Sequence, residues 1–282
     1  MSVRVDSRLL SGSYAGANDE KATAMNQPTS NSAEIKILKD LEEISRHAAD
    51  EILRRANAVK PANGRFAIAL SGGSTPKLLH KRLGSEPPVR NRMPWESTHF
   101  FWGDERHVPP DDPQSNYRMA RETLFDAAPV PAQNIHRVPA EEPDAGLCAE
   151  KYERELLAFF GLKPGHMPRF DCIMLGIGSD GHTASLFPGT DALHEKKRLV
   201  VANWVEKLHA HRITMTAPVL NNAALVLFLV SGKEKAEVLK EVLEGDYRPD
   251  LFPAQLIRPK HGRLLWLVDQ AAAGCLTDSI KL

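Results

Sequence analysis

The sequence has no excess of charge of either sign, and this absence excludes several classes of protein. The 282 residues include 36 basic and 36 acidic side chains, so the formal net charge is zero. Proteins that bind nucleic acid usually carry a basic excess or a basic stripe, and neither is present here. A wholly disordered chain is excluded as well, because 42% of the residues are apolar and can form a core.

Long apolar runs and cysteine pairs are also missing. No run of about 18 apolar residues occurs, so we predict no transmembrane helix. The three cysteines, Cys148, Cys172 and Cys275, lie far apart without a CxxC pair, which indicates free thiols in a reducing compartment. His209 and His211 have no third ligand nearby in the sequence, so we expect no metal. These absences predict a cytoplasmic protein that binds neither nucleic acid nor a membrane.

The first 33 residues differ in composition from the rest of the chain. They are rich in Ser, Gly, Ala, Asn and Thr, and their few apolar residues show no period, which predicts a disordered extension over residues 1–33. From Ile35 to Ala56 apolar residues recur at helical spacing, with Asn31 or Ser32 available as a cap. Residues 34–282 contain no Pro/Gly-rich linker and no repeat, so we predict one domain there.

Short apolar runs alternate with amphipathic segments along this domain. Strands are expected near residues 66–70, 99–102, 171–175, 199–202, 213–216, 225–230 and 264–268, and helices near 77–83, 116–125, 146–160 and 234–243. Gly84, Gly161 and Gly245 stand where these helices are expected to end. The alternation predicts an α/β fold with a mostly parallel sheet covered by helices on both faces. In such sheets ligands bind beyond the carboxyl ends of the strands.

The loop after the first apolar strand has the composition of a phosphate site. Gly72 and Gly73 let a ligand approach the backbone, and the hydroxyls of Ser74 and Thr75 are further donors. We expect Thr75 to cap a helix that begins at Pro76, so that free amides and the helix dipole favour an anion. An ordinary strand-to-helix turn uses the same residue types, and both interpretations stay open.

The loop after the strand near residues 99–102 is charged. Asp104, Glu105 and Arg106 follow directly, and two acids and a base at the end of a strand suit acid–base chemistry or recognition of hydroxyl groups. A solvated charged turn is the alternative. Two later cations, Arg212 and Lys233, are candidates for a phosphate contact or are simply solvated side chains.

A glycine-rich loop after residues 171–175 contains the best catalytic candidates. Residues 176–181 match GxGxxG, but Pro188 interrupts the chain too early for the crossover helix of a dinucleotide site, and no acidic residue ends a strand about 20 residues later. The glycines are more consistent with a tight loop that presents Asp180 and His182 to a cleft. Histidine titrates near neutral pH, so His182 is a candidate general base and acid.

Seven segments taken together resemble one enzyme family. The chain is similar to 6-phosphogluconolactonases, of the sugar-phosphate isomerase and deaminase type, over about residues 34–276. The segments that carry the resemblance are LSGGSTP at 70–76, FWGDERHVP at 101–109, SNYRMARETL at 115–124, LGIGSDGHTASLFPG at 175–189, RITMTAPVLN at 212–221, VLFLVSGKEKAEVL at 226–239 and PAQLIRP at 253–259.

The resemblance implies a modified Rossmann-like α/β domain and the hydrolysis of a sugar-phosphate lactone, 6-phospho-D-glucono-1,5-lactone, in the oxidative pentose phosphate pathway. It implies no metal and no cofactor. The implied role of His182 is to activate water and then protonate the leaving oxygen, with Asp180 or Asp104 supporting the imidazole and Arg106 or backbone amides stabilising the oxyanion. Residues 72–75, Arg212 and Lys233 would hold the phosphate.

Two other functions remain as alternatives. The related glucosamine-6-phosphate deaminases continue the glycine-rich loop as GHIAFNEP, whereas residues 181–188 read GHTASLFP and lack the carboxylate, which favours the lactonase. A non-catalytic sugar-phosphate sensor would keep the phosphate loop without needing His182. The oligomeric state stays open, and a monomer is compatible with the sequence.

Overall fold

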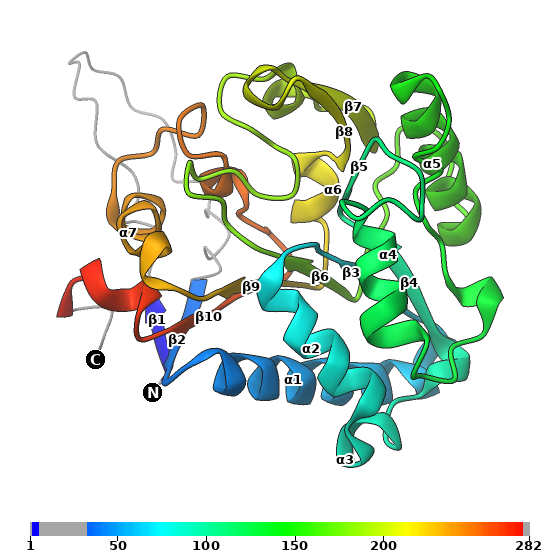
Figure 1. The fold of residues 1–282 in the computed structure, drawn as a ribbon, viewed down its shortest axis with the longest axis horizontal. Helices are drawn as coiled ribbons and strands as arrows, with labels where there is room; N and C mark the ends of the chain where they lie inside the picture. Colours follow the sequence, from blue (N-terminus) through cyan, green and yellow to red (C-terminus); the bar gives the residue numbers. More distant parts are fainter. Residues whose placement is uncertain (1, 6–32, 279–282) are drawn as a thin grey trace, which may run out of the picture.

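The protein is described by a computed structural model over residues 2–5 and 33–278, and its main feature is a seven-stranded sheet (Figure 1). The edge strand β1 is antiparallel to β2, and every other pairing is parallel. The predicted mostly parallel sheet is thereby confirmed. In spatial order its strands are β1 (Ser2–Val5), β2 (Ala33–Leu38), β10 (Arg263–Asp269), β9 (Leu225–Val230), β6 (Cys172–Leu175), β3 (Phe66–Leu70) and β4 (Thr98–Trp102).

Helices flank this sheet, as the alternating pattern predicted. In the view of Figure 1, α1 and α2 run below the sheet and a small second sheet lies above it. No helix within the described residues is long and apolar enough to cross a membrane. The helices are α1 (Leu41–Asn63), α2 (Ser74–Ser85), α3 (Pro87–Arg90), α4 (Asn116–Ala120), α5 (Ala145–Phe160), α6 (Ala217–Asn221) and α7 (Ala236–Glu244), with short turns η2 (Trp95–Ser97), η3 (Arg121–Phe125, π-helical), η4 (Ala132–Asn134), η5 (Asp191–His194), η6 (Glu206–Leu208), η7 (Lys233–Lys235), η8 (Pro253–Leu256) and η9 (Ala272–Cys275).

The central strands are apolar along their whole length because both faces of the sheet are covered. Every residue of β3 and of β9 is buried. On the neighbouring strands β9 and β10, the rings of Phe228 and Trp266 stack with centroids 3.7 Å apart. Burying one such side chain contributes about 1.5–3 kcal/mol to stability. This core holds the strand ends, and therefore the loops that follow them, in fixed positions.

The prediction of a helix beginning near Ile35 was wrong. Residues 33–38 form β2, and α1 begins only at Leu41, where the carboxylate of Asp40 accepts a hydrogen bond from the amide of Glu43 at 3.0 Å. Ile35 and Leu38 are buried by parallel pairing with β10 instead. Within the predicted extension, Ser2–Val5 forms a strand, residues 6–32 lie outside the described residues, and the domain boundary stays a prediction.

The second sheet was not predicted. It has three antiparallel strands in the order β5 (Asp104–Arg106), β8 (Ala210–Met215) and β7 (Val200–Val205). The segments near 199–202 and 213–216 are therefore strands of this sheet and not of the main one. The charged loop after β4 is itself a strand, with Asp104 opposite Thr214 and Arg106 opposite Arg212. A three-residue polar strand has no apolar alternation, so its sequence pattern indicates a turn.

Both predicted ends of α2 differ from the structure. The helix begins at Ser74 with Gly73 as its N-cap, so Thr75 lies inside its first turn. Gly84 does not end the helix, which continues to Ser85. An added Cβ at Gly84 would lie 2.8 Å from the carbonyl oxygen of Leu124. This glycine lets α2 pack closely against η3. Gly161 does end α5, in the left-handed conformation expected of a cap.

Candidate active site

The carboxyl ends of four neighbouring strands, β9, β6, β3 and β4, bring the predicted loops together. They border a cleft of about 370 Å³ that opens beyond the sheet, where ligands of α/β proteins bind. Six of the sequence-predicted residues line this cleft: Gly72, Gly73, Asp104, Arg106, His182 and Arg212. The structure thus brings these six residues, which come from four separate segments of the chain, to one cleft.

A histidine–aspartate pair forms the centre of the loop after β6. Nδ1 of His182 lies 2.5 Å from Oδ1 of Asp180, and the amide of His182 also donates to that oxygen at 3.2 Å. Gly178 makes this pair possible, because a Cβ at that position would lie 2.0 Å from Nδ1 of His182 and 2.7 Å from Oδ1 of Asp180. The glycine-rich sequence thus serves the close approach of two side chains.

The surroundings of His182 keep its imidazole neutral. Burial lowers the pKa of His182 to about 4, with Arg106, Arg212 and Lys235 adding to the decrease and Asp104 opposing it. A neutral ring that donates from Nδ1 to Asp180 carries its lone pair on Nε2. Within residues 33–278 no hydrogen bond occupies Nε2, so the ring can accept a proton there.

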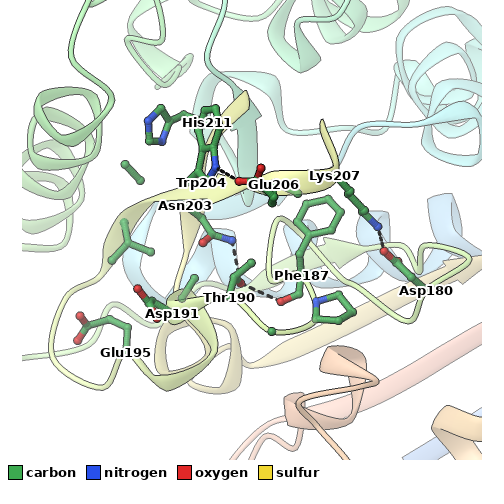
Figure 2. A pocket seen from close by; sticks show the side chains of 16 residues that line it. Asp180, Phe187, Thr190, Asp191, Glu195, Asn203, Trp204, Glu206, Lys207 and His211 are labelled. Carbon is green, nitrogen blue, oxygen red and sulfur yellow. Dashed lines mark hydrogen bonds and ion pairs between the residues drawn. The ribbon is translucent and has the colours of Figure 1, made fainter. Parts of the chain in front are cut away.

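Two side chains beyond the sequence predictions enclose the pair. The ring of Phe187 stacks on the imidazole of His182 with centroids 4.0 Å apart. Lys207, in η6, forms an ion pair with Asp180, and its Nζ lies 4.8 Å from the centroid of the Phe187 ring. Figure 2 shows Phe187, Lys207 and Asp180 together on one wall of a second cavity, of about 790 Å³, under the β7–β8 hairpin.

The carboxylate of Asp104 is buried on the other side of the cleft. Its Oδ2 accepts a hydrogen bond from the hydroxyl of Ser185 at 2.6 Å, which ties β5 to the loop of His182. Glu105 has a different role, because backbone amides of Arg106, Asn116 and Tyr117 donate to it. Burial raises the pKa of Glu105, and these amides partly offset the increase. Glu105 therefore anchors the start of α4.

Two arginines lie side by side across the strands β5 and β8. Arg106 and Arg212 are cross-strand partners, and burial together with the charge of Arg106 lowers the pKa of Arg212. Arg106 donates to the carbonyl oxygen of Gln114, and Arg212 to that of His211. In the part of the chain that the structure describes, neither guanidinium forms an ion pair with a carboxylate. Such a pair of cations is suited to an anionic ligand.

A smaller pocket of about 120 Å³ adjoins the cleft at the start of α2. Ser74 and Thr75 line it, and Gly72, Gly73 and Lys235 line both the pocket and the cleft. No side chain caps the first turn of α2 and no acidic residue lies in it, so its amides are available to an anion. Lys233 lines neither space, whereas Lys235, two residues later in η7, lines both.

Metal ligation has no candidate in the described chain. Residues 2–5 and 33–278 contain no cluster of three His, Cys, Asp or Glu side chains that could hold an ion. The ring of His211 packs against Trp204, with centroids 4.9 Å apart, while His209 occupies the hairpin tip in a left-handed conformation.

Comparison with known proteins identifies the family. The model of the glucosamine-6-phosphate isomerases/6-phosphogluconolactonase family matches residues 39–266. The chain belongs to this family. Among similar relatives, 6-phosphogluconolactonase of Nostoc sp. is 41% identical over 86% of this chain and 98% of its own length. That of Synechocystis sp. is 46% identical, over 74% and 84% of the two chains. The solved structure of 6-phosphogluconolactonase from Trypanosoma cruzi matches with a TM-score of 0.77 at 31% identity, over 89% of this chain and all of that one.

Membership in the glucosamine-6-phosphate isomerase/6-phosphogluconolactonase family confirms the resemblance derived from the seven sequence segments. Those segments contain the loop ends that line the cleft, including Lys235 in VLFLVSGKEKAEVL at 226–239. Lys207 lies outside all of them, and no local pattern marks it. Only the fold brings it to Asp180, 27 residues earlier in the chain.

Proposed function

We propose that this protein hydrolyses 6-phospho-D-glucono-1,5-lactone to 6-phosphogluconate, the second reaction of the oxidative pentose phosphate pathway. The observation that carries the proposal is a neutral His182, oriented by Asp180, in a cleft continuous with an anion pocket. The names of the relatives support the same reaction. A cytoplasmic location is part of the proposal, because the buried free thiols Cys148 and Cys172 suit a reducing compartment.

The substrate phosphate is assigned to the smaller pocket. There the first-turn amides of α2, the hydroxyls of Ser74 and Thr75, and the ammonium of Lys235 surround it, and Arg212 adds a second cation from the cleft. Fixing the phosphate places the lactone ring in the larger cleft. Holding the ester in one orientation removes part of the entropic cost of the reaction.

His182 then acts as general base and general acid. Nε2 takes a proton from water while the water oxygen bonds to the lactone carbonyl carbon, and the carbonyl oxygen becomes an oxyanion. Arg106 faces this cleft and stabilises the negative charge. When the bond from that carbon to the ring oxygen breaks, the imidazolium of His182 returns its proton to the ring oxygen, and the new carboxylic acid ionises.

Asp180 sets the tautomer of His182 that these two proton transfers require. By accepting the Nδ1 proton it leaves Nε2 as the basic nitrogen and stabilises the imidazolium that forms. Asp104, the other carboxylate considered for this role, is bound to Ser185 instead and acts on the imidazole through charge alone.

The deaminase reaction remains the second candidate function. Position 187 is where the sequence motifs of the two enzymes differ in a charged group. In the deaminase motif a carboxylate follows the histidine, whereas here Phe187 covers the imidazole with an apolar ring. This apolar cover on one face of the ring keeps a second negative charge from the imidazole. The arrangement therefore favours ester hydrolysis over the deaminase reaction.

The test is a direct assay of both reactions. The lactone is generated in situ from glucose 6-phosphate by its dehydrogenase, and its disappearance is followed above the spontaneous rate, with ammonia release from glucosamine 6-phosphate measured in parallel. We expect rapid lactone loss without ammonia. Replacing His182 with Ala should lower kcat by about 10²–10⁴-fold. Ammonia release without lactone hydrolysis would refute the proposed function, and full activity of a folded His182→Ala protein would refute the mechanism.

A further inference from the structure

Four side chains form a closed ring of contacts where the cleft adjoins the second cavity. Lys207 pairs with Asp180, Asp180 accepts from His182, His182 stacks on Phe187, and Nζ of Lys207 lies over the Phe187 ring. Three of the four belong to the loop after β6. Only Lys207 comes from elsewhere, from the tip of the β7–β8 hairpin (Figure 2).

We propose that Lys207 is a positioning residue that holds Asp180 and Phe187 against His182 and so maintains the reactive orientation of the imidazole. The inference rests on the proposed function and adds to it a residue from the small sheet. Lys207 does not line the pocket assigned to the phosphate, although it lines the cleft and the second cavity. Its charge is therefore directed at the carboxylate and not at the substrate phosphate.

The ion pair between Lys207 and Asp180 contributes little to the free energy of folding. The Lys207 side chain is 52% exposed, and exposed ion pairs contribute little to folding. Its effect on the imidazole is larger, because Asp180 lies in direct contact with Nδ1. A carboxylate that is already paired with an ammonium stabilises an imidazolium less than a free carboxylate does.

The other charged groups around His182 are the same in the wild type and in a Lys207 variant, so only the loss of the lysine changes the pKa of the imidazole. Asp104 and Arg106 face it from β5, Arg212 from β8 and Lys235 from η7. All of these remain when Lys207 is replaced by Met, a side chain of similar length. The substitution removes one cation and frees the charge of Asp180, and both effects favour the protonated imidazole.

The first measurement needs no substrate. Histidine Cε1 resonances are followed by NMR against pH in the ligand-free protein, with His182 assigned by its loss in His182→Asn. We expect Lys207→Met to raise the imidazole pKa by about one unit. Lys207→Arg should keep the wild-type titration because it keeps the charge. Lys196→Met, which removes an exposed lysine from the segment between η5 and β7, is the matched control and should change nothing.

The second measurement is kinetic. In Lys207→Met we expect kcat to fall about tenfold with KM within twofold, and the acid limb of the pH–rate profile to move to higher pH by the same shift as the NMR titration. In an Asp180→Asn background Lys207→Met should have a smaller effect than in the wild type, because the part of the lysine's effect that acts through that carboxylate is already lost.

The outcomes separate this inference from the proposed function. An unchanged His182 titration in a folded Lys207→Met protein would overturn the inference even if the lactone is hydrolysed. A higher KM with an unmoved acid limb would also overturn it, because Lys207 would then bind substrate directly. If the wild-type protein fails to hydrolyse the lactone, the proposed function falls, and the NMR titration still decides the role of Lys207.

Discussion

Replacing Gly178 with Ala should disable the active site while leaving the fold intact. The added methyl group would lie 2.0 Å from Nδ1 of His182, 2.1 Å from Cε1 of the same ring and 2.7 Å from Oδ1 of Asp180. Gly178 is not among the glycines with a positive φ, so Ala can adopt its backbone conformation. The three atoms nearest to the added methyl group all belong to the two side chains that we assign to catalysis.

The size of the effect follows from these distances. A carbon and a nitrogen that are not bonded approach to about 3.5 Å, so the imidazole must move by more than 1 Å or rotate away from Asp180. A displacement of about 1 Å in a catalytic group costs about 10²-fold in rate. We therefore expect kcat to fall at least 10²-fold, with KM nearly unchanged because the phosphate pocket is untouched. Overpacking of this kind destabilises the protein by about 1–3 kcal/mol.

The assay is lactone hydrolysis, accompanied by thermal unfolding to verify the fold. Gly103→Ala is the matched control, since that glycine lies between β4 and β5, does not line the cleft, and has only the carbonyl oxygen of Leu70 near its missing Cβ, at 3.7 Å. It should keep wild-type kcat. A folded Gly178→Ala protein with kcat within threefold of wild type would refute the assignment of His182 and Asp180.

Three further predictions concern substrate binding and stability. Lys235→Ala should raise KM about tenfold through loss of a phosphate contact, whereas Lys233→Ala should leave KM within twofold; equal effects would refute the assignment of the phosphate pocket. His80 is fully buried, and burial lowers its pKa to about 4, below the value of 6.5 in the unfolded chain. Between these values the unfolded state binds more protons, so stability is lost as the pH falls from 6.5 to 4, by about 3 kcal/mol. Urea unfolding at pH 7 and pH 4.5 should show a smaller loss in His80→Leu, and an equal loss would contradict this account. Tyr152→Phe removes a hydroxyl that bonds the amide and carbonyl of Trp102, and should cost about 1–3 kcal/mol in the same experiment; a loss below 0.5 kcal/mol would mean that these groups find other partners.

The main sheet could be predicted because its central strands are buried on both faces. Continuous apolar runs such as residues 66–70 and 225–230 have no other simple explanation between amphipathic segments. The error at Ile35 arose because β2 and α1 are separated by only two residues, so Leu38 and Leu41 together imitate a helical period. Residues 104–106 form a strand only by pairing with β8, more than a hundred residues later, and no local pattern reports such a partner.

The site was predictable where its residues follow a strand end directly. Asp104 follows β4 closely, and Asp180 and His182 lie in the loop after β6. The structure shows the contact with the imidazole at Asp180, a choice that the sequence left open. Lys233 and Lys235 are equivalent in sequence terms, since both follow β9, and only the turn of η7 places Lys235 in the cleft. Lys207 depends on the path of a hairpin from another sheet.

The paired arginines of β5 and β8 have a consequence for the free protein. With no carboxylate partner for either within the described residues, Arg106 and Arg212 repel each other whenever the cleft holds no anion. A bound sugar phosphate relieves this repulsion in the folded state alone, so ligand concentration and folding stability are thermodynamically linked. Inside a cell, the concentration of the sugar phosphate would then also influence how much of the enzyme remains folded.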